Sequence, residues 1–163
     1  MNTSHEFRPL ARYRQELSEE ECLSILKKEL RGVLSVNGDH GYPYGMPLDH
    51  YYNEDDGCLY FHSGKNGHRL DALKADDKVS YCVLCEEGRK EGDWALVFKS
   101  VIVFGRMEIV EDQQLIADIC RRLSYKFTDD EAYIEGEIAR SLPATILLRL
   151  RIEHLSGKRV TES

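Results

Sequence analysis

The residues whose types and spacing best suit binding chemistry lie in YFHSGKNGHRLDAL, residues 60–73. A strand-like segment ends there in two closely spaced glycines, and a helical segment follows. Glycine lets the backbone approach a ligand closely, and the start of a helix presents free N–H groups and a positive dipole end. Lys65, His68 and Arg69 add cationic side chains, and Ser63 adds a hydroxyl. Together these features suit an anion such as a phosphate group.

The residue types alone leave a second interpretation open, in which the segment is a solvated basic turn that only reverses the chain. It is not a P-loop, because the pattern G-x-x-x-x-G-K-[ST] and its β-α-β setting are absent. His62 and Ser63 would point to opposite sides of an ideal strand. Both can contact one ligand only if the strand ends or twists at Gly64.

Two other pairs of residues could do chemistry and are less convincing. Asp49 and His50 could form an acid–base pair, but neighbours in a strand face opposite sides. The same argument applies to Cys82 and Cys85, which form a C-x-x-C within a strand-like run, whereas a redox or zinc pair needs converging sulfurs. We therefore expect these two to be buried or half-buried strand cysteines, and we expect no metal site.

The composition describes the chain that must position these residues. Its 163 residues suffice for one domain with one hydrophobic core, and residues 1–17 could form an arm. The formal net charge of −7 disfavours general nucleic-acid binding, which needs a basic face. No apolar run approaches the roughly 20 residues that span a bilayer, and the chain starts without a hydrophobic signal core. We therefore expect a cytoplasmic protein. Five cysteines, an odd number in such a chain, predict no disulfide framework.

The pattern of elements indicates a mainly β protein. Ser18 and Glu21 fit a capping box that starts a helix over residues 19–30. Short strands and tight turns follow up to about residue 110, and these favour an antiparallel barrel or sandwich. The second of these strands, YGMPLDHYYN, contains Pro47, which predicts an edge or a bulge. Two helices, from Asp112 and from residue 129 or 130 to 142, then precede a last strand, ATILLRLRIEHLSGKRV.

Several phrases resemble the FMN-binding split barrels related to pyridoxamine 5′-phosphate oxidase, and within them the nitroimidazole-resistance (nitroimidazole reductase) branch. They are RGVLSVNG, YGMPLDHYY, LYFHSGKNGHRLDALKADDKVSYCV, VFKSVIVFGRMEIVED and RIEHLSGK. The phrases span residues 20–158, and FHSGKNGHR is the most specific. The arginine and histidine pattern with which pyridoxamine 5′-phosphate oxidase itself binds substrate has no counterpart in IEHLSGKRVTES, so vitamin B6 oxidation is the weaker expectation.

This resemblance implies a six-stranded antiparallel split β-barrel with flanking helices, assembled as a homodimer with FMN at the interface. It places His62 beside the flavin as the candidate catalytic residue, and it lets Trp94 reach across the interface. The residues that it assigns to the cofactor are Met46, Pro47, Leu48, Tyr51, His62, Ser63, Lys65, His68, Arg69, Lys99 and Ser100.

The function that follows is an FMN-dependent oxidoreductase that passes electrons to a small aromatic or nitro-aromatic acceptor, with NAD(P)H as a candidate donor. We expect neither a nucleic acid nor a membrane as partner. The alternative is a non-catalytic barrel that stores or senses a flavin or haem. A haem would need an axial ligand such as His154 or His5. The third possibility is a barrel that has lost its cofactor and serves as a dimeric scaffold.

Overall fold

The computed structural model describes residues 7–89 and 91–161. Its helices and strands follow one another as α1 (Glu19–Lys28), β1 (Arg31–Asn37), β2 (Pro43–Asp49), β3 (Tyr51–Asn53), β4 (Cys58–Gly64), α2 (His68–Ala75), β5 (Lys78–Arg89), β6 (Leu96–Val110), α3 (Gln113–Ser124), α4 (Glu131–Ser141) and β7 (Thr145–Thr161). Short 3-10 turns lie at Tyr13–Gln15, Asp39–Gly41 and Leu142–Ala144.

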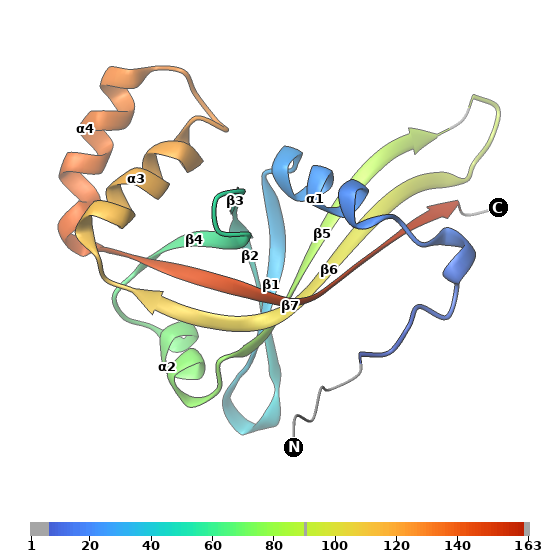
Figure 1. Cartoon of the computed structure of the whole chain (residues 1–163), viewed down its shortest axis with the longest axis horizontal. Coiled ribbons are helices and arrows are strands. Elements are labelled where there is room, and N and C mark those ends of the chain that lie inside the picture. Colours follow the sequence, from blue (N-terminus) through green and yellow to red (C-terminus); the bar gives the residue numbers. More distant parts are fainter. Residues whose placement is uncertain (1–6, 90, 162–163) are drawn as a thin grey trace.

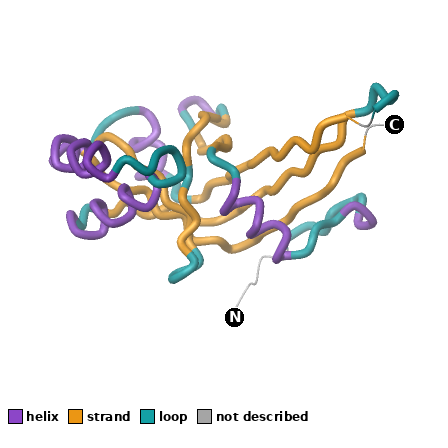
Figure 2. The backbone as a smooth tube through the Cα atoms, turned by 90° about the horizontal axis from the view of Figure 1, so that it is seen from above, coloured by secondary structure: helices purple, strands orange, loops and turns teal. Residues whose placement is uncertain are grey.

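The seven strands form one antiparallel sheet in the order β2-β1-β5-β6-β7-β4-β3. The sheet curls into a half-barrel, with α3 and α4 at one end (Figures 1 and 2). At the other end, parts of β5, β6 and β7 extend as an arm, along which the chain before α1 runs (Figure 1). The predicted mainly β split barrel with flanking helices is confirmed.

The strand count is seven and not the predicted six, because the segment YGMPLDHYYN is broken at His50. The backbone N–H of His50 bonds to the Leu30 carbonyl, and the His50 side chain turns into the core. The two halves, β2 and β3, therefore become the two edges of the sheet. The prediction of an edge at Pro47 is confirmed, since Pro47 lies on β2.

The first helix starts as the sequence predicts. Glu21 N–H donates to Ser18 Oγ at 3.2 Å and Ser18 N–H donates to the Glu21 carboxylate at 2.9 Å, which completes the capping box. The helix ends at Lys28 and not at residue 30, because Glu29 is already extended. Both later helices are capped by aspartates, Asp112 and Asp130, as the sequence indicates.

Two long strands, β6 and β7, carry the sheet from the arm to the helical end. Their register shifts between Phe104 and Gly105, which marks a bulge. A Cβ at Gly105 would lie 2.1 Å from the Arg151 carbonyl oxygen, so this crossing needs glycine. The main core fills the curl of the sheet around Leu26, Phe61 and Tyr81, and a second cluster lies under α3 around Ile116.

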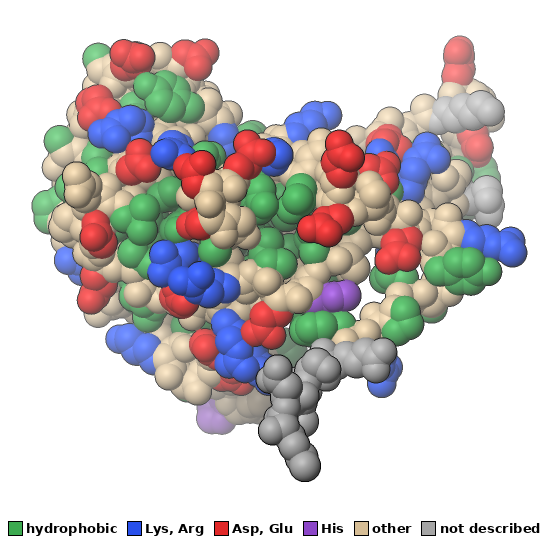
Figure 3. All heavy atoms as spheres, viewed as in Figure 1, with side chains coloured by type: hydrophobic (Ala, Val, Ile, Leu, Met, Phe, Trp, Pro, Cys, Tyr) green, Lys and Arg blue, Asp and Glu red, His purple; other side chains and the backbone are tan. Residues whose placement is uncertain are grey.

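The surface carries both signs of charge. On the face that Figure 3 shows, acidic and basic side chains are interspersed over the described residues and no patch of one sign stands out. Within the same residues, no helix is both long and apolar enough to cross a bilayer.

Candidate functional site

The strand–turn–helix between β4 and α2 builds a pocket at one edge of the barrel. Strand β4 ends at Gly64, and α2 begins at His68 after Gly67, whose φ of 128° is accessible to glycine without strain. No side chain caps this helix start. A Cβ at Gly64 or Gly67 would meet nothing within 4 Å, so the turn is open to an incoming group.

Arg69 projects into this pocket from the first turn of α2. Its Nη2 donates to Ser63 Oγ at 2.6 Å, and its Nη1 lies 3.8 Å from Met46 Sδ. Its Nε is buried without a hydrogen-bond partner, and burial lowers the pKa of its guanidinium. Within the described residues no ion pair joins Arg69 to a carboxylate. An arginine keeps its proton in proteins, so this is a partly desolvated cation that lacks a counter-ion.

The walls of the pocket come from β2 and β4. Pro47 and Leu48 form one side, and His62, Ser63 and Gly64 form the other, around an open volume of about 480 Å³. Ser63 is buried and its hydroxyl contacts Arg69, whereas His62 is exposed. Both line the same pocket because β4 ends at the next residue, Gly64. The sequence analysis required such a strand end for His62 and Ser63 to contact one ligand.

Two further lining residues, Arg31 and Asp49, are absent from the sequence prediction as pocket residues. Arg31 Nε donates to Asp49 Oδ1 at 2.6 Å across the β1–β2 pair, in which the two residues are direct partners. Aligning RGVLSVN against PYGMPLD as a hairpin would have found them, because it brings opposite charges face to face. Sequence analysis discussed Asp49 as a partner of its neighbour His50 and did not name it among the individual cofactor residues.

His50 is a structural residue. Its ring is fully buried, with Nδ1 2.7 Å from the Tyr81 hydroxyl and Nε2 2.7 Å from the Leu26 carbonyl. A carbonyl can only accept, so Nε2 carries the proton. The one Tyr81 hydroxyl proton then faces two acceptors, His50 Nδ1 at 2.7 Å and the Leu48 carbonyl at 2.9 Å. Burial, reinforced by the nearby Lys126 charge, lowers the pKa of His50 to about 4. The ring joins α1 to β5 and makes no acid–base pair with Asp49.

The other predicted cofactor residues lie at varying distances from the pocket. Met46 is buried beneath Arg69, and Lys65 is exposed on the turn. His68 stacks on Tyr44 with ring centroids 4.3 Å apart and lies 3.6 Å from Asp39. Within the described residues, none of these three lines the pocket. Their roles toward a cofactor stay predictions.

Three predicted residues lie on other parts of the sheet. Tyr51 packs against the cluster under α3. Lys99 and Ser100 belong to β6, where Lys99 Nζ lies 2.9 Å from Glu87 and Ser100 is buried. Trp94, in the loop before β6, is 71% exposed. Within one protomer the structure does not bring these residues to Arg69.

The remaining candidates also have defined places. Cys82 is exposed and Cys85 half-buried, at strand positions that face opposite sides, so the expectation of burial was wrong for Cys82. His154 stacks on Phe7 with centroids 4.6 Å apart. His5 lies outside the described residues.

Comparisons with known proteins agree with this architecture. A solved structure of a candidate 5-nitroimidazole antibiotic resistance protein from Bacteroides thetaiotaomicron superposes with a TM-score of 0.75 at 16% identity, over 90% of this chain and 87% of that one. The flavocytochrome Anf3 from Azotobacter vinelandii gives 0.76 at 21% identity, over 95% and 73%. An FAD-binding protein from Mesorhizobium loti gives 0.67 at 29% identity, over 90% and 97%.

Among curated protein sequences, none is similar enough to match. The sequence profile of the family described as pyridoxamine 5′-phosphate oxidase, however, matches residues 18–159, which include every strand that lines the pocket and nearly the whole sheet. The chain therefore belongs to the pyridoxamine 5′-phosphate oxidase family.

Proposed function

We propose that this protein is an FMN-dependent oxidoreductase whose cofactor phosphate binds at the β4–α2 turn. The observation that carries the proposal is Arg69, a partly buried guanidinium with an unpartnered Nε and no carboxylate partner in the described chain. A phosphate would supply the missing counter-ion and accept from Arg69 and from the free N–H groups of α2. Lys65, exposed on the same turn, would add a second positive charge.

A bound flavin would supply hydride or single-electron transfer, and the protein would supply position and electrostatics. Arg69, held by Ser63, would fix the phosphate end. Pro47 and Leu48 would form an apolar wall for the ring system. Two-electron reduction of an acceptor also consumes protons, and His62 at the pocket rim is placed to donate one.

The partners in this proposal are a small aromatic acceptor, NAD(P)H as electron donor and a second copy of the chain. An outer row of side chains supports the dimer: Val33, Cys82 and Ile102 lie in register across three strands, and Val33 is 45% exposed. Leu84, 51% exposed, extends the row along β5. Trp94, exposed in the loop before β6, is the residue that we expect to reach across this interface. We expect the protein to act in the cytoplasm.

The test is a flavin titration of the apoprotein. Wild-type protein should bind FMN and show flavin absorbance, and sedimentation should give about twice 18.8 kDa. Lys65→Ala/Arg69→Ala should weaken FMN binding more than tenfold, because charge-assisted phosphate contacts contribute roughly 1.5–3 kcal/mol each. Lys74→Ala/Arg89→Ala, two exposed cations elsewhere, makes the same charge change and should bind FMN within about twofold of wild type.

Equal FMN affinity in the two double variants would refute the phosphate assignment. Anaerobic bleaching of the bound flavin by NAD(P)H separates a reductase from a carrier, and a Soret band in the purified protein would indicate haem instead. His62→Gln should retain FMN but lose turnover, since His62 lies at the rim and not among the phosphate contacts.

A further inference from the structure

A second cavity lies between the α3–α4 hairpin and the barrel. Its volume is about 280 Å³, and most of its lining is apolar. Ile116 and Leu123 of α3 and Ile138 of α4 are buried and form its inner wall. Cys120 lies between the two α3 residues on the same wall and is half-buried.

This cavity shares two wall residues with the pocket that contains Arg69. Asp49, at the end of β2, and His62, on β4, line both. A molecule in the cavity would therefore lie beside whatever occupies the pocket, with the His62 ring at the boundary between them. No other residue among those that the structure describes lines both spaces.

The cavity is partly open to solvent, and its volume of about 280 Å³ sets the size of the molecule that fits in it. A dry cavity of about 150 Å³ is enough to bind benzene. The space under α3 and α4 thus accommodates a substituted single ring, whereas a dinucleotide is far too large for it.

The charges around the cavity select against anions. Two carboxylates, Asp49 and Glu137, line it, and no lysine or arginine does so within the described residues. Asp49 is paired with Arg31 and Glu137 with Arg140, so the field of each carboxylate is partly balanced from outside. An anionic ligand would lose hydration without meeting a lysine or arginine among the described lining residues. A neutral ring loses little on entry.

We propose that the cavity under the α3–α4 hairpin is the binding site for a small, neutral aromatic molecule, with its ring against Ile116, Leu123 and Ile138 and its polar substituent toward His62. That this molecule is the electron acceptor rests on the proposed function. The binding itself does not, since it follows from the shape and the lining of the cavity.

A matched pair of probes tests the site by 19F NMR titration of the full-length protein, with and without FMN. 4-Fluorobenzyl alcohol is neutral, and 4-fluorobenzoate is an anion of nearly the same shape. The alcohol should bind wild-type protein at least tenfold more tightly than the benzoate. Cys120→Phe fills the cavity and should weaken binding of the alcohol at least tenfold, whereas Cys120→Ser keeps the volume and should bind within about twofold of wild type.

Ser141→Trp provides a second blocking variant in case Cys120→Phe does not fold, because Ser141 is an exposed rim residue at the end of α4. Unchanged binding of the alcohol in the folded blocking variants would overturn the proposal, as would equal affinity for the two probes.

FMN titration of the same variants separates this proposal from the proposed function. Cys120 and Ser141 do not line the Arg69 pocket, so their variants should bind FMN normally. If wild-type protein binds no FMN but still binds the alcohol in a Cys120→Phe-sensitive way, the cavity stands and the flavin assignment fails.

Discussion

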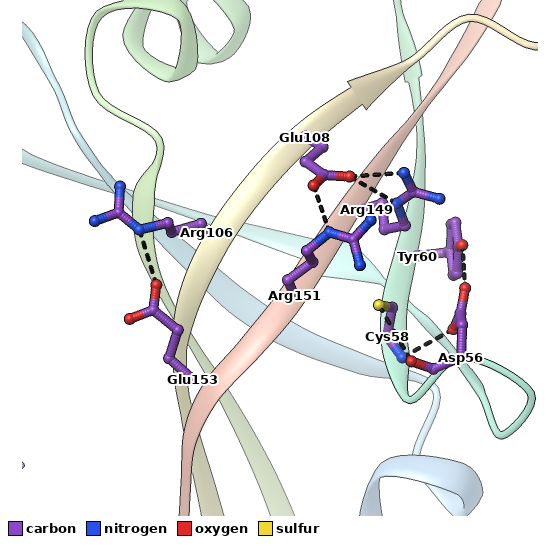
Figure 4. Close-up of polar contacts among 8 residues, drawn as sticks. All are labelled: Asp56, Cys58, Tyr60, Arg106, Glu108, Arg149, Arg151 and Glu153. Atoms are coloured by element: carbon purple, nitrogen blue, oxygen red, sulfur yellow. Dashed lines mark hydrogen bonds and ion pairs between the residues drawn. The ribbon is translucent and has the colours of Figure 1, made fainter. Parts of the chain in front are cut away.

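Strand β4 has an arginine against each of its ends, and the two arginines have opposite surroundings. At one end Arg149 lies opposite Tyr60 in the β4–β7 register, and its Nε donates to Glu108 Oε2 at 2.8 Å. Its Nη2 lies 2.7 Å from the same oxygen in an ion pair. Arg151 bonds the other oxygen of the same carboxylate (Figure 4). At the other end the hydrogen bonds of Arg69 within the described residues go to neutral groups, those of Ser63 and Met46.

The difference supports the proposed ligand site at the Arg69 end of β4. A cation removed from water is costly unless it is paired. The Arg149 end meets this requirement within the fold, and there the pKa of Glu108 is lowered by its bonds to Arg151 and Arg149. At the Arg69 end the partly buried cation has no carboxylate partner within the described residues, so folding alone does not account for an arginine there. An anion from solution would complete that end.

The largest expected effect is the stabilisation by FMN. A ligand at about 100 times its Kd raises the free energy of unfolding by about 2.7 kcal/mol. We expect this increment in wild-type protein and in Arg149→Met. In Arg69→Met at the same FMN concentration it should fall to roughly 0.3–1.3 kcal/mol, because one charge-assisted phosphate contact contributes roughly 1.5–3 kcal/mol. Urea unfolding with and without FMN measures it. An increment of equal size in both variants would show that the two ends of β4 do not differ as proposed.

Much of this fold could be predicted from the sequence because its signals are local. The capping box at Ser18, the aspartate caps of α3 and α4, and the glycine-rich turn after β4 each depend on a few neighbouring residues. The break at His50 could not be predicted, because it depends on partners in α1 and β5 that become neighbours only in the folded chain.

The candidate site also has a part that depends on neighbouring residues and a part that depends on long-range contacts. Sequence reasoning grouped Ser63 with Arg69, which are six residues apart across one turn, and in the structure their side chains are in contact. It missed Arg31, which reaches the pocket only through the β1–β2 register. The cavity beneath α3 and α4 was equally invisible, because its lining joins residues from five separate elements and their connecting turns.

A smaller effect is the pH dependence of stability that His50 causes. This basic side chain is also withdrawn from water, but it avoids the cost of burying a charge because it is neutral. Its pKa of about 4 in the fold lies below its ordinary 6.5, so between these values the unfolded chain binds the extra proton. Stability should therefore fall as the pH drops from 6.5 to 4 and be insensitive to this group below 4. The expected loss by pH 5 is about 2 kcal/mol.

Urea unfolding at pH 7 and pH 5 measures this loss. His50→Gln should be less stable than wild type at pH 7, because buried bonds to Tyr81 and Leu26 are lost, but its stability should vary less between the two pH values. His40→Asn, at an exposed residue with φ 58° that asparagine tolerates, should keep the wild-type dependence. The same pH dependence in His50→Gln as in wild type would contradict the account of His50.

The smallest expected effect is a difference in stability between the two arginine variants without FMN. Urea unfolding of the apoprotein measures it. Arg149→Met removes a hydrogen bond and an ion pair to Glu108 and should lower the free energy of unfolding by roughly 1 kcal/mol, since the pair is partly exposed and Arg151 still holds the carboxylate. Arg69→Met removes a partly desolvated, unpaired cation and should leave stability unchanged or slightly higher. Arg and Met have nearly equal helix propensity, so that difference contributes little at Arg69 in α2. A clear loss of stability in Arg69→Met would therefore mean that Arg69 is needed for folding and not reserved for an anion.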